Sequence, residues 1–293
     1  MKSSLFLSLA ASALVASTIW AADPPKPLHV LIVAGGCCHD YLNQPLILKD
    51  GLEARANVKV DVAYNWDKST KMTFSAYDSP DWAKGFDVVI HDECSSDVMD
   101  HPYVDNIVNA HKNGLPGVNL HCAMHSYRKG FKTGEPQPAG SEQAIWYDYL
   151  GLQSQHHGKQ LPISITFVDT THPITKGMEN WTTIKEELYN NVWKDDNFKN
   201  WPAAHPLARG KQDAGDKIGE NNSVIVWTNE YGPKKTRVFS TTLGHNNETV
   251  SDPRYLDLIT RGLLWTCNKL GDDSKPVAGY EAQPKSAAAA AQK

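Results

Sequence analysis

Three histidines of this sequence stand at or just beyond the ends of apolar runs. His39 follows VLIVAGGCC, His121 ends GVNLH, and His245 follows VFSTTLG. Neutral imidazole nitrogens bind zinc and similar divalent ions, and a histidine also exchanges protons near neutral pH. Glu186 and Glu187, in the segment KEELY, supply carboxylates that could complete such a site. We therefore predict catalytic roles for His121, His245 and Glu187, and a divalent-metal site, zinc for example, that adds His39 to these three.

Each of these side chains, taken alone, could instead have a purely structural role. A lone histidine near a strand end is more often a hydrogen-bonded structural residue than a ligand, whereas three at one sheet edge favour a functional site. The chain has no HExxH or HxH motif, so a metal site must be assembled from distant segments. Without a metal, these residues would act by proton transfer alone.

Cys122 follows His121 directly and raises the alternative of a cysteine nucleophile on a strand-to-helix turn. Such a turn usually has flanking glycines, and Ala123 stands where a glycine would help. We therefore expect Cys122 to be a small packing residue. Five cysteines are present, so at least one thiol is expected to stay free. Adjacent Cys37 and Cys38 are not expected to bridge each other, because a disulfide requires a particular Cα separation.

Other side chains are predicted to contact the ligand or to fill the core. Aromatic faces suit a neutral, hydroxyl-rich ligand, although the nine tryptophans could equally fill a core. His156 and His157, in the polar segment QSQHHGKQ, are expected to be solvated, and His91 is expected to pack inside a strand. The predicted ligand-binding residues are His39, Asp40, His125 and Trp146.

The elements that must position these residues alternate between strand and helix in the first half. The run at 28–36 is apolar throughout, which is typical of a parallel strand buried on both faces. This alternation predicts a doubly wound α/β sheet, in which ligands bind beyond the carboxyl ends of the strands. The predicted strands are 28–36, 58–64, 86–92 and 115–121, and the predicted helices are 43–55 and 101–114.

The second half is less regular. Strands are predicted at 162–169, 223–229 and 236–244, the last two as a hairpin, and a closing helix at 252–270. The segment 171–222 is rich in Trp, Asn, Asp and Pro, and we predict it to be a long insertion made mainly of loops.

Residues 1–22 have the pattern of an export signal, with Lys2, an apolar core and small residues before a cleavage region. The predicted domain is 27–270, and the low-complexity segment 271–293 is predicted to be disordered. No later segment reaches the roughly 18–20 apolar residues of a membrane span. The net charge of −4 gives no basis for nucleic-acid binding. We expect an exported protein, periplasmic or extracellular; nothing in the sequence indicates its oligomeric state.

An ordered set of motifs resembles the ThuA-like (trehalose utilisation) family from about residue 28 to residue 270. The motifs are VLIVAGGCCHD, GVNLHCAMHS, HPITKGM, KEELY, VIVWTNEYGPKKTRVFSTTLGH and RGLLWTC. That family is similar in fold to class I glutamine amidotransferases, which have a flavodoxin-like, mostly parallel sheet with helices on both faces. The amidotransferase cysteine position is taken here by His121, and the position of the triad histidine by His245.

The resemblance implies a role in bacterial disaccharide catabolism, particularly in routes through 3-keto-sugars. It points to His39, His121, Glu187 and His245 as the pocket, and to a glycoside or its 3-keto derivative as the substrate. Two alternatives remain: a non-catalytic sugar-binding protein of the same pathway, and a hydrolase that uses Cys122. The chain departs from the family in carrying Cys37–Cys38 and His125.

Overall fold

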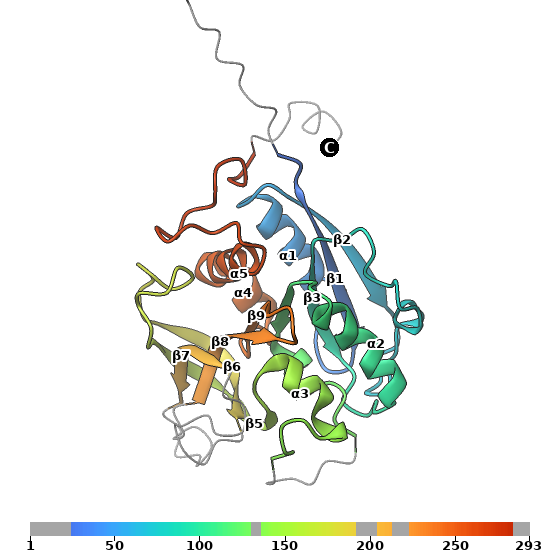
Figure 1. The fold of residues 1–293 in the computed structure, drawn as a ribbon. Helices are drawn as coiled ribbons and strands as arrows, with labels where there is room; N and C mark the ends of the chain where they lie inside the picture. Colours follow the sequence, from blue (N-terminus) through green and yellow to red (C-terminus); the bar gives the residue numbers. More distant parts are fainter. Residues whose placement is uncertain (1–24, 130–135, 192–203, 213–222, 284–293) are drawn as a thin grey trace, which may run out of the picture.

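The computed structural model of the chain describes residues 25–129, 136–191, 204–212 and 223–283. Within them a single mixed sheet of nine strands runs through the molecule in the order β2-β1-β3-β4-β9-β8-β7-β5-β6 (Figure 1). Helices cover the parallel half of this sheet, and the antiparallel half extends it beyond β9. The sheet thus combines a parallel core with an antiparallel extension.

The parallel half has the strand order of a flavodoxin-like sheet. Strands β1 and β3 lie side by side at its centre, and every neighbouring pair in this half runs parallel. The predicted doubly wound α/β core is therefore confirmed. Its strands, in spatial order, are β2 (Val58–Asn65), β1 (Leu28–Gly36), β3 (Val88–Cys94), β4 (Gly117–Leu120) and β9 (Thr236–Thr241).

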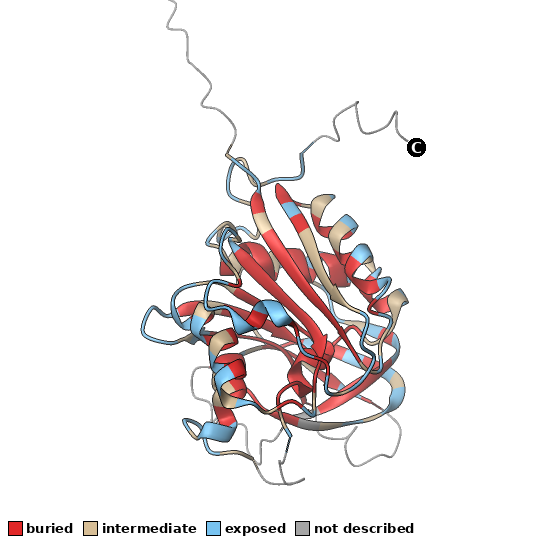
Figure 2. Cartoon of the chain, turned by 90° about the vertical axis from the view of Figure 1, so that its right-hand side faces the viewer, coloured by how far each residue is buried: buried red, intermediate tan, exposed pale blue. Residues whose placement is uncertain are grey.

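Helices pack on both faces of this half because its strands are apolar on both sides. Val30 and Ile32 of β1 belong to the core under α1 and α5, whereas Leu31 and Val33 belong to the core under α2 and α3. The buried strands between two helical layers are visible in Figure 2. The helices are α1 (Gln44–Glu53), α2 (His101–Lys112), α3 (Ile145–Leu150), α4 (Asn247–Val250) and α5 (Pro253–Thr266). Three short 3₁₀ turns complete the helical elements: η1 (Ser75–Asp78), η2 (His121–His125) and η3 (Glu142–Ala144).

Two of the helices begin where the sequence supplies a cap. The Asp100 carboxylate accepts a hydrogen bond from the backbone N–H of Tyr103 at the start of α2, and Asp252 accepts one from Arg254 at the start of α5. A proline in the first turn of each helix has no N–H that would need a partner there. The predicted helices 101–114 and 252–270 are therefore confirmed, although each ends a few residues earlier than predicted.

The antiparallel half corrects the prediction of a loop-dominated insertion. Its strands are β5 (Ser154–Phe167), β6 (Trp181–Asn191), β7 (His205–Lys211) and β8 (Ser223–Tyr231), so β6 and β7 lie within 171–222. The pairing of β5 with β6 shifts register three times, which interrupts the alternation of polar and apolar residues that reveals a strand. The hairpin of β8 and β9 is confirmed.

The chain ends differ from the prediction in part. Residues 271–283, predicted to be disordered, contact the start of the domain: Asn57 N–H donates to the Tyr280 carbonyl at 3.0 Å, and Ala56 bridges Glu281. Tyr280 also packs against the core. Backbone hydrogen bonds and one aromatic side chain hold this segment, and neither is revealed by its composition. The predicted signal, 1–22, and residues 284–293 lie outside the described residues. Within the described part of the chain, no helix is long and apolar enough to cross a membrane.

A buried polar network lies under α2, on one face of β3. His91, predicted to be a core residue, is fully buried, as is His111. The two imidazoles meet at 3.0 Å between their Nε2 atoms, and His91 Nδ1 lies 2.9 Å from Glu93 Oε1. Burial, followed by the neighbouring His91, lowers the pKa of His111 well below its ordinary value of 6.5. His111 therefore stays neutral in the folded chain.

The free energy of unfolding is expected to fall as the pH falls below about 6.5. There His111 is protonated in the unfolded chain but not in the folded one, so acid favours the unfolded state. Each such histidine lowers stability by about 1.4 kcal/mol per pH unit. Urea unfolding of the chelator-treated protein between about pH 7 and 5 measures the slope of the free energy of unfolding against pH. His111→Gln should reduce this slope by the contribution of about one bound proton. The same slope in both proteins would contradict the neutral state of His111.

Candidate metal and active site

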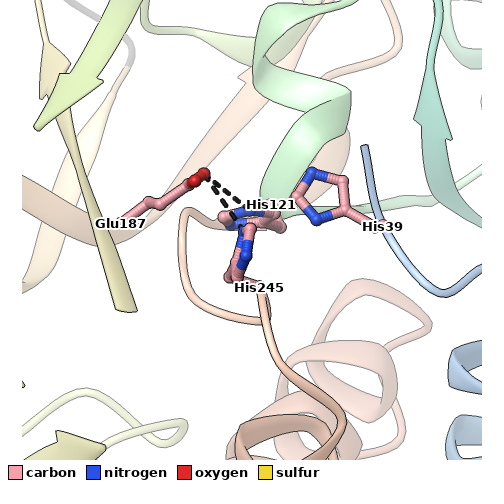
Figure 3. Close-up of side chains that lie close together, drawn as sticks. All are labelled: His39, His121, Glu187 and His245. Atoms are coloured by element: carbon pink, nitrogen blue, oxygen red, sulfur yellow. Dashed lines mark ion pairs between the residues drawn. The ribbon is translucent and has the colours of Figure 1, made fainter. Parts of the chain in front are cut away.

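Four predicted residues meet at the carboxyl edge of the parallel strands. Figure 3 shows His39, His121, Glu187 and His245 converging from four separate segments of the chain. Each offers one ligand atom, and these atoms all lie within 4.8 Å of one another. The structure thus brings together the residues predicted as ligands.

The turn after β4 positions His121. This residue has a φ of 41°, in the left-handed region that non-glycine residues rarely adopt, and it opens the 3₁₀ turn η2. Its Nδ1 lies 2.6 Å from the Thr242 carbonyl at the end of β9, so Nδ1–H is the donor and Nε2 carries the free lone pair. Nε2 faces the site, 3.5 Å from Glu187 Oε2 and 3.3 Å from the Tyr189 hydroxyl.

Strand β6 supplies two neighbouring carboxylates with different tasks. Glu186 is fully buried and accepts hydrogen bonds from the backbone N–H groups of His245 (3.1 Å) and Asn246 (3.3 Å), which fixes the loop after β9. Glu187 points into the site instead, because successive residues of a strand face opposite ways. Its Oε2 lies 3.2 Å from His245 Nδ1.

The arrangement fits a tetrahedral metal ion better than a hydrogen-bonded cluster. Nδ1 of His39 and Nδ1 of His245 are buried and have no hydrogen-bond partner among the described residues, although His245 Nδ1 lies so near Glu187. Ligand atoms about 2.0–2.2 Å from a tetrahedral zinc lie roughly 3.3–3.6 Å from one another, close to the separations of Glu187 Oε2 from the two histidines. The Thr242 carbonyl orients His121 as an outer-shell partner orients a metal ligand.

The local electrostatics favour, at His39 and Glu187, the protonation states that a cation needs. Burial, followed by the neighbouring His121 and His245, lowers the pKa of His39 from 6.5 to about 2. Burial opposes ionisation of Glu187, but the two adjacent histidines outweigh it and hold the pKa of this carboxyl well below its ordinary range. For His245, burial lowers the pKa, yet the Glu187 carboxylate raises it above 6.5 overall. Glu187 is therefore ionised and His39 neutral.

A pocket of about 250 Å³ opens beside the cluster. His39 and Glu187 form part of its wall, together with His125, His157 and Tyr189. His125 is buried, stacks on the Tyr189 ring with centroids 4.1 Å apart, and reaches Ser154 Oγ with Nε2 at 2.9 Å. The structure therefore places His125, predicted to bind the substrate, in the lining of the pocket.

Two other residues predicted to bind the substrate have different positions. Trp146, on α3, is fully buried in the core that α2 and α3 cover, and it donates from Nε1 to the Ala123 carbonyl at 2.8 Å. It therefore supports the η2 turn and does not line the pocket. Asp40 is exposed and accepts hydrogen bonds from Asn43 and Asn247, both at 2.7 Å. It thereby joins the start of α1 to α4 and does not belong to the cluster.

His157 was expected to be a solvated loop residue, and the structure corrects this in part. Its ring is exposed, but it lies on β5 with Nε2 3.5 Å from Glu187 Oε2. Gln160 and Tyr189, which the sequence did not single out, also belong to the site: the Gln160 amide lies 2.8 Å from His245 Nε2. Only the pairing of β5 with β6 brings these residues near the cluster, and no local motif signals that pairing.

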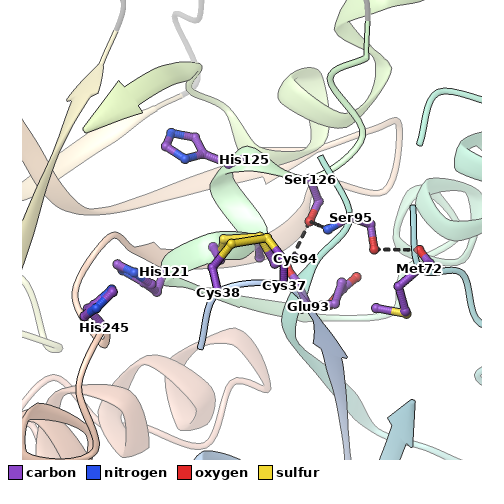
Figure 4. The surroundings of a disulfide bond; sticks show 12 residues. Cys37, Cys38, Met72, Glu93, Cys94, Ser95, His121, His125, Ser126 and His245 are labelled. Atoms are coloured by element: carbon purple, nitrogen blue, oxygen red, sulfur yellow. Dashed lines mark hydrogen bonds between the residues drawn. A yellow bond between two sulfur atoms is a disulfide. The ribbon is translucent and has the colours of Figure 1, made fainter. Parts of the chain in front are cut away.

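The cysteines are arranged differently from the prediction. Cys37 and Cys38 form a disulfide although they are neighbours, because Cys38 adopts a left-handed backbone with a φ of 84°. Cys122 is buried, as expected of a packing residue, but it is bonded to Cys94 at the end of β3. Cys267 is the free thiol that the odd count required. The surroundings of these bonds appear in Figure 4.

Comparisons with known proteins agree with this architecture. A ThuA-like protein of Parabacteroides merdae shares 18% identity, with a TM-score of 0.61 over 88% of this chain and 98% of that one. A second ThuA-like protein, from Bacteroides uniformis, shares 14% identity, with a TM-score of 0.58 over 85% and 94%. At such identities the likeness shows a shared fold.

Sequence comparison extends this from fold to family. No curated protein matches the chain in sequence. The family model for ThuA, described as trehalose utilisation, matches residues 29–266, which is most of the chain and includes all four residues of the cluster. The chain is a member of the ThuA trehalose-utilisation family.

Proposed function

We propose that this protein is an exported enzyme of bacterial carbohydrate catabolism that acts on a disaccharide, a glycoside or its 3-keto derivative. The observation that carries the proposal is the set of three histidines and one carboxylate that converges beside an open pocket. Membership of a trehalose-utilisation family supports a sugar as the substrate. Export is supported by the amino-terminal pattern of apolar and small residues.

His39, His121, Glu187 and His245 would hold a divalent ion, zinc for example. When bound, such an ion would polarise a carbonyl or hydroxyl oxygen of the sugar. The chain itself supplies the surrounding groups: the Tyr189 hydroxyl lies 3.3 Å from His121 Nε2, and His157 presents a further imidazole near Glu187. A pocket of about 250 Å³ falls below the roughly 300–1,000 Å³ of typical ligand sites, which suits one sugar ring.

Proton transfer would be shared among the same groups. His157 is exposed at the pocket, a position that suits a general acid or base. In the reaction without a metal, His245, with its raised pKa, would donate a proton, and ionised Glu187, whose lowered pKa makes it a weak base, would orient His245 and stabilise its charged form.

Turnover of trehalose and of its 3-keto derivative tests the proposal, with and without added zinc or manganese. Wild type is expected to consume one of them, and His245→Asn to lower kcat/KM by about 10²–10⁴-fold, the range of a lost acid–base group. His205→Asn, which alters an exposed histidine paired with Asp169, is the matched control and should keep wild-type activity. Equal rates in the folded His245→Asn protein would refute the proposed site. Saturable sugar binding without turnover would instead favour the non-catalytic alternative.

A further inference from the structure

Four cysteines form one wall of the same pocket, and the candidate metal site uses none of them. Cys37 is bonded to Cys38, and Cys94 to Cys122. The two disulfides are close neighbours, since Cys37 Sγ lies 3.5 Å from Cys94 Sγ (Figure 4). All four residues line the pocket. Two disulfides in contact beside a functional site suggest chemistry between them.

The four sulfurs differ in their access to solvent. Cys38 is exposed and Cys37 is half-buried, whereas Cys94 and Cys122 are only 3% and 6% exposed. A thiol reductant therefore meets Cys38 first, and access is one of the factors that decide which sulfur of a disulfide is attacked. Attack at Cys38 releases Cys37, which is the sulfur that lies beside Cys94.

We infer that the four cysteines form a thiol–disulfide relay, in which two electrons from a thiol reductant that attacks Cys38 leave Cys38 and Cys122, the residue next to His121, as thiols and join Cys37 to Cys94. The inference rests on the contact between the two disulfides and on the gradient of exposure. It holds whether or not the neighbouring site binds a metal or turns over a sugar.

The relay consists of three exchanges. A reductant thiolate attacks Cys38 Sγ, forms a mixed disulfide there and expels the Cys37 thiolate. Cys37 then attacks Cys94 Sγ, forming a Cys37–Cys94 disulfide and expelling the Cys122 thiolate. A second reductant thiol attacks the reductant sulfur of the mixed disulfide. The two reductant molecules leave joined by a disulfide, and the Cys38 thiolate is released. Two thiols are thus oxidised to one disulfide, and their two protons pass to Cys38 and Cys122.

Partial reduction of the full-length wild-type protein by 2-mercaptoethanol tests this order. Samples are quenched with acid, unfolded, alkylated, and mapped by peptide mass spectrometry. Before reduction, the relay requires the 37–38 and 94–122 pairs. During reduction it requires a Cys37–Cys94 linked peptide, together with alkylated Cys38 and Cys122. Absence of the two starting disulfides, or direct reduction of 94–122 while 37–38 persists, would overturn it.

Cys38→Ser and Cys37→Ser form a matched pair, because each removes the same disulfide. In Cys38→Ser the remaining Cys37 thiol lies beside Cys94 and should displace Cys122 without any reductant. In Cys37→Ser the remaining thiol is Cys38, and Cys122 should stay bonded to Cys94. Alkylation of Cys122 is expected to be at least roughly tenfold greater in the first variant, with Cys267 as the internal reference. Equal labelling of Cys122 in both variants would refute the relay.

Discussion

The wild-type protein is expected to retain a bound metal ion, and His121→Ala is expected to lose it. Among the described residues His121 contributes one of the four candidate ligand atoms of the cluster, and its Nε2 is held toward Glu187 by the bond from Nδ1 to Thr242. Removal of an outer-shell partner alone typically lowers metal affinity 10–100-fold, so loss of a ligand should cost more than about 100-fold. Elemental analysis of protein purified without added metal or chelator, followed by competition titration with zinc, measures both quantities.

The control for this prediction is His205→Ala, which removes an exposed histidine that lies away from the cluster and pairs with Asp169. It should bind as much metal as wild type. A metal content that is equal in wild type and in folded His121→Ala would show that the ion, if any, lies elsewhere. No metal in either protein, even after zinc is added, would leave His121 and His245 as proton-transfer groups.

Trp146→Ala is expected to lower the free energy of unfolding by about 3–5 kcal/mol, the usual cost of emptying a large buried aromatic site. Trp146 is fully buried, contacts Tyr127 with ring centroids 4.9 Å apart, and donates to the Ala123 carbonyl. The substitution would leave a cavity under η2 and remove one of the two hydrogen bonds that the Ala123 carbonyl accepts, the other coming from the Ser126 backbone N–H. Denaturant unfolding of the wild-type and variant proteins gives the difference.

Trp66→Ala is the matched control, because Trp66 is 71% exposed. Its substitution should change stability by no more than about 0.5 kcal/mol, as for most surface positions. If Trp146→Ala were as stable as Trp66→Ala but had lost sugar binding, the Trp146 ring would contact the substrate and would not be a core residue. That result would support the prediction that Trp146 binds the substrate.

The parallel half of the fold could be predicted from the sequence because its strands are continuous apolar runs. The strand at 28–36 coincides with β1, and α1 and α2 lie where helical spacing placed them. Strands β6 and β7 could not be predicted in the same way. Both belong to the antiparallel extension, where bulges and polar residues break the period of two and where pairing is decided by distant neighbours.

The residues of the candidate site were also only partly predictable from the sequence. His39, His121 and His245 could be placed at one sheet edge because each follows a recognisable strand. Glu187 was suggested by its residue type and by the family resemblance, while its position depends on β6. Trp146 illustrates the limit: composition reveals an aromatic residue near the site, but only packing decides whether the ring faces the pocket or the core.

The ligand atoms of the cluster come from nearly opposite ends of the chain, with His39 just after β1 and His245 just after β9. No fragment that lacks β9 can contain the complete set, so a growing or partly folded chain has no complete site to offer to a metal ion. Contacts so distant in sequence form slowly. An ion that binds only the finished arrangement stabilises the native state by mass action, by about 2.7 kcal/mol when its concentration is a hundred times Kd. The supply of metal would then influence how long each folded molecule persists.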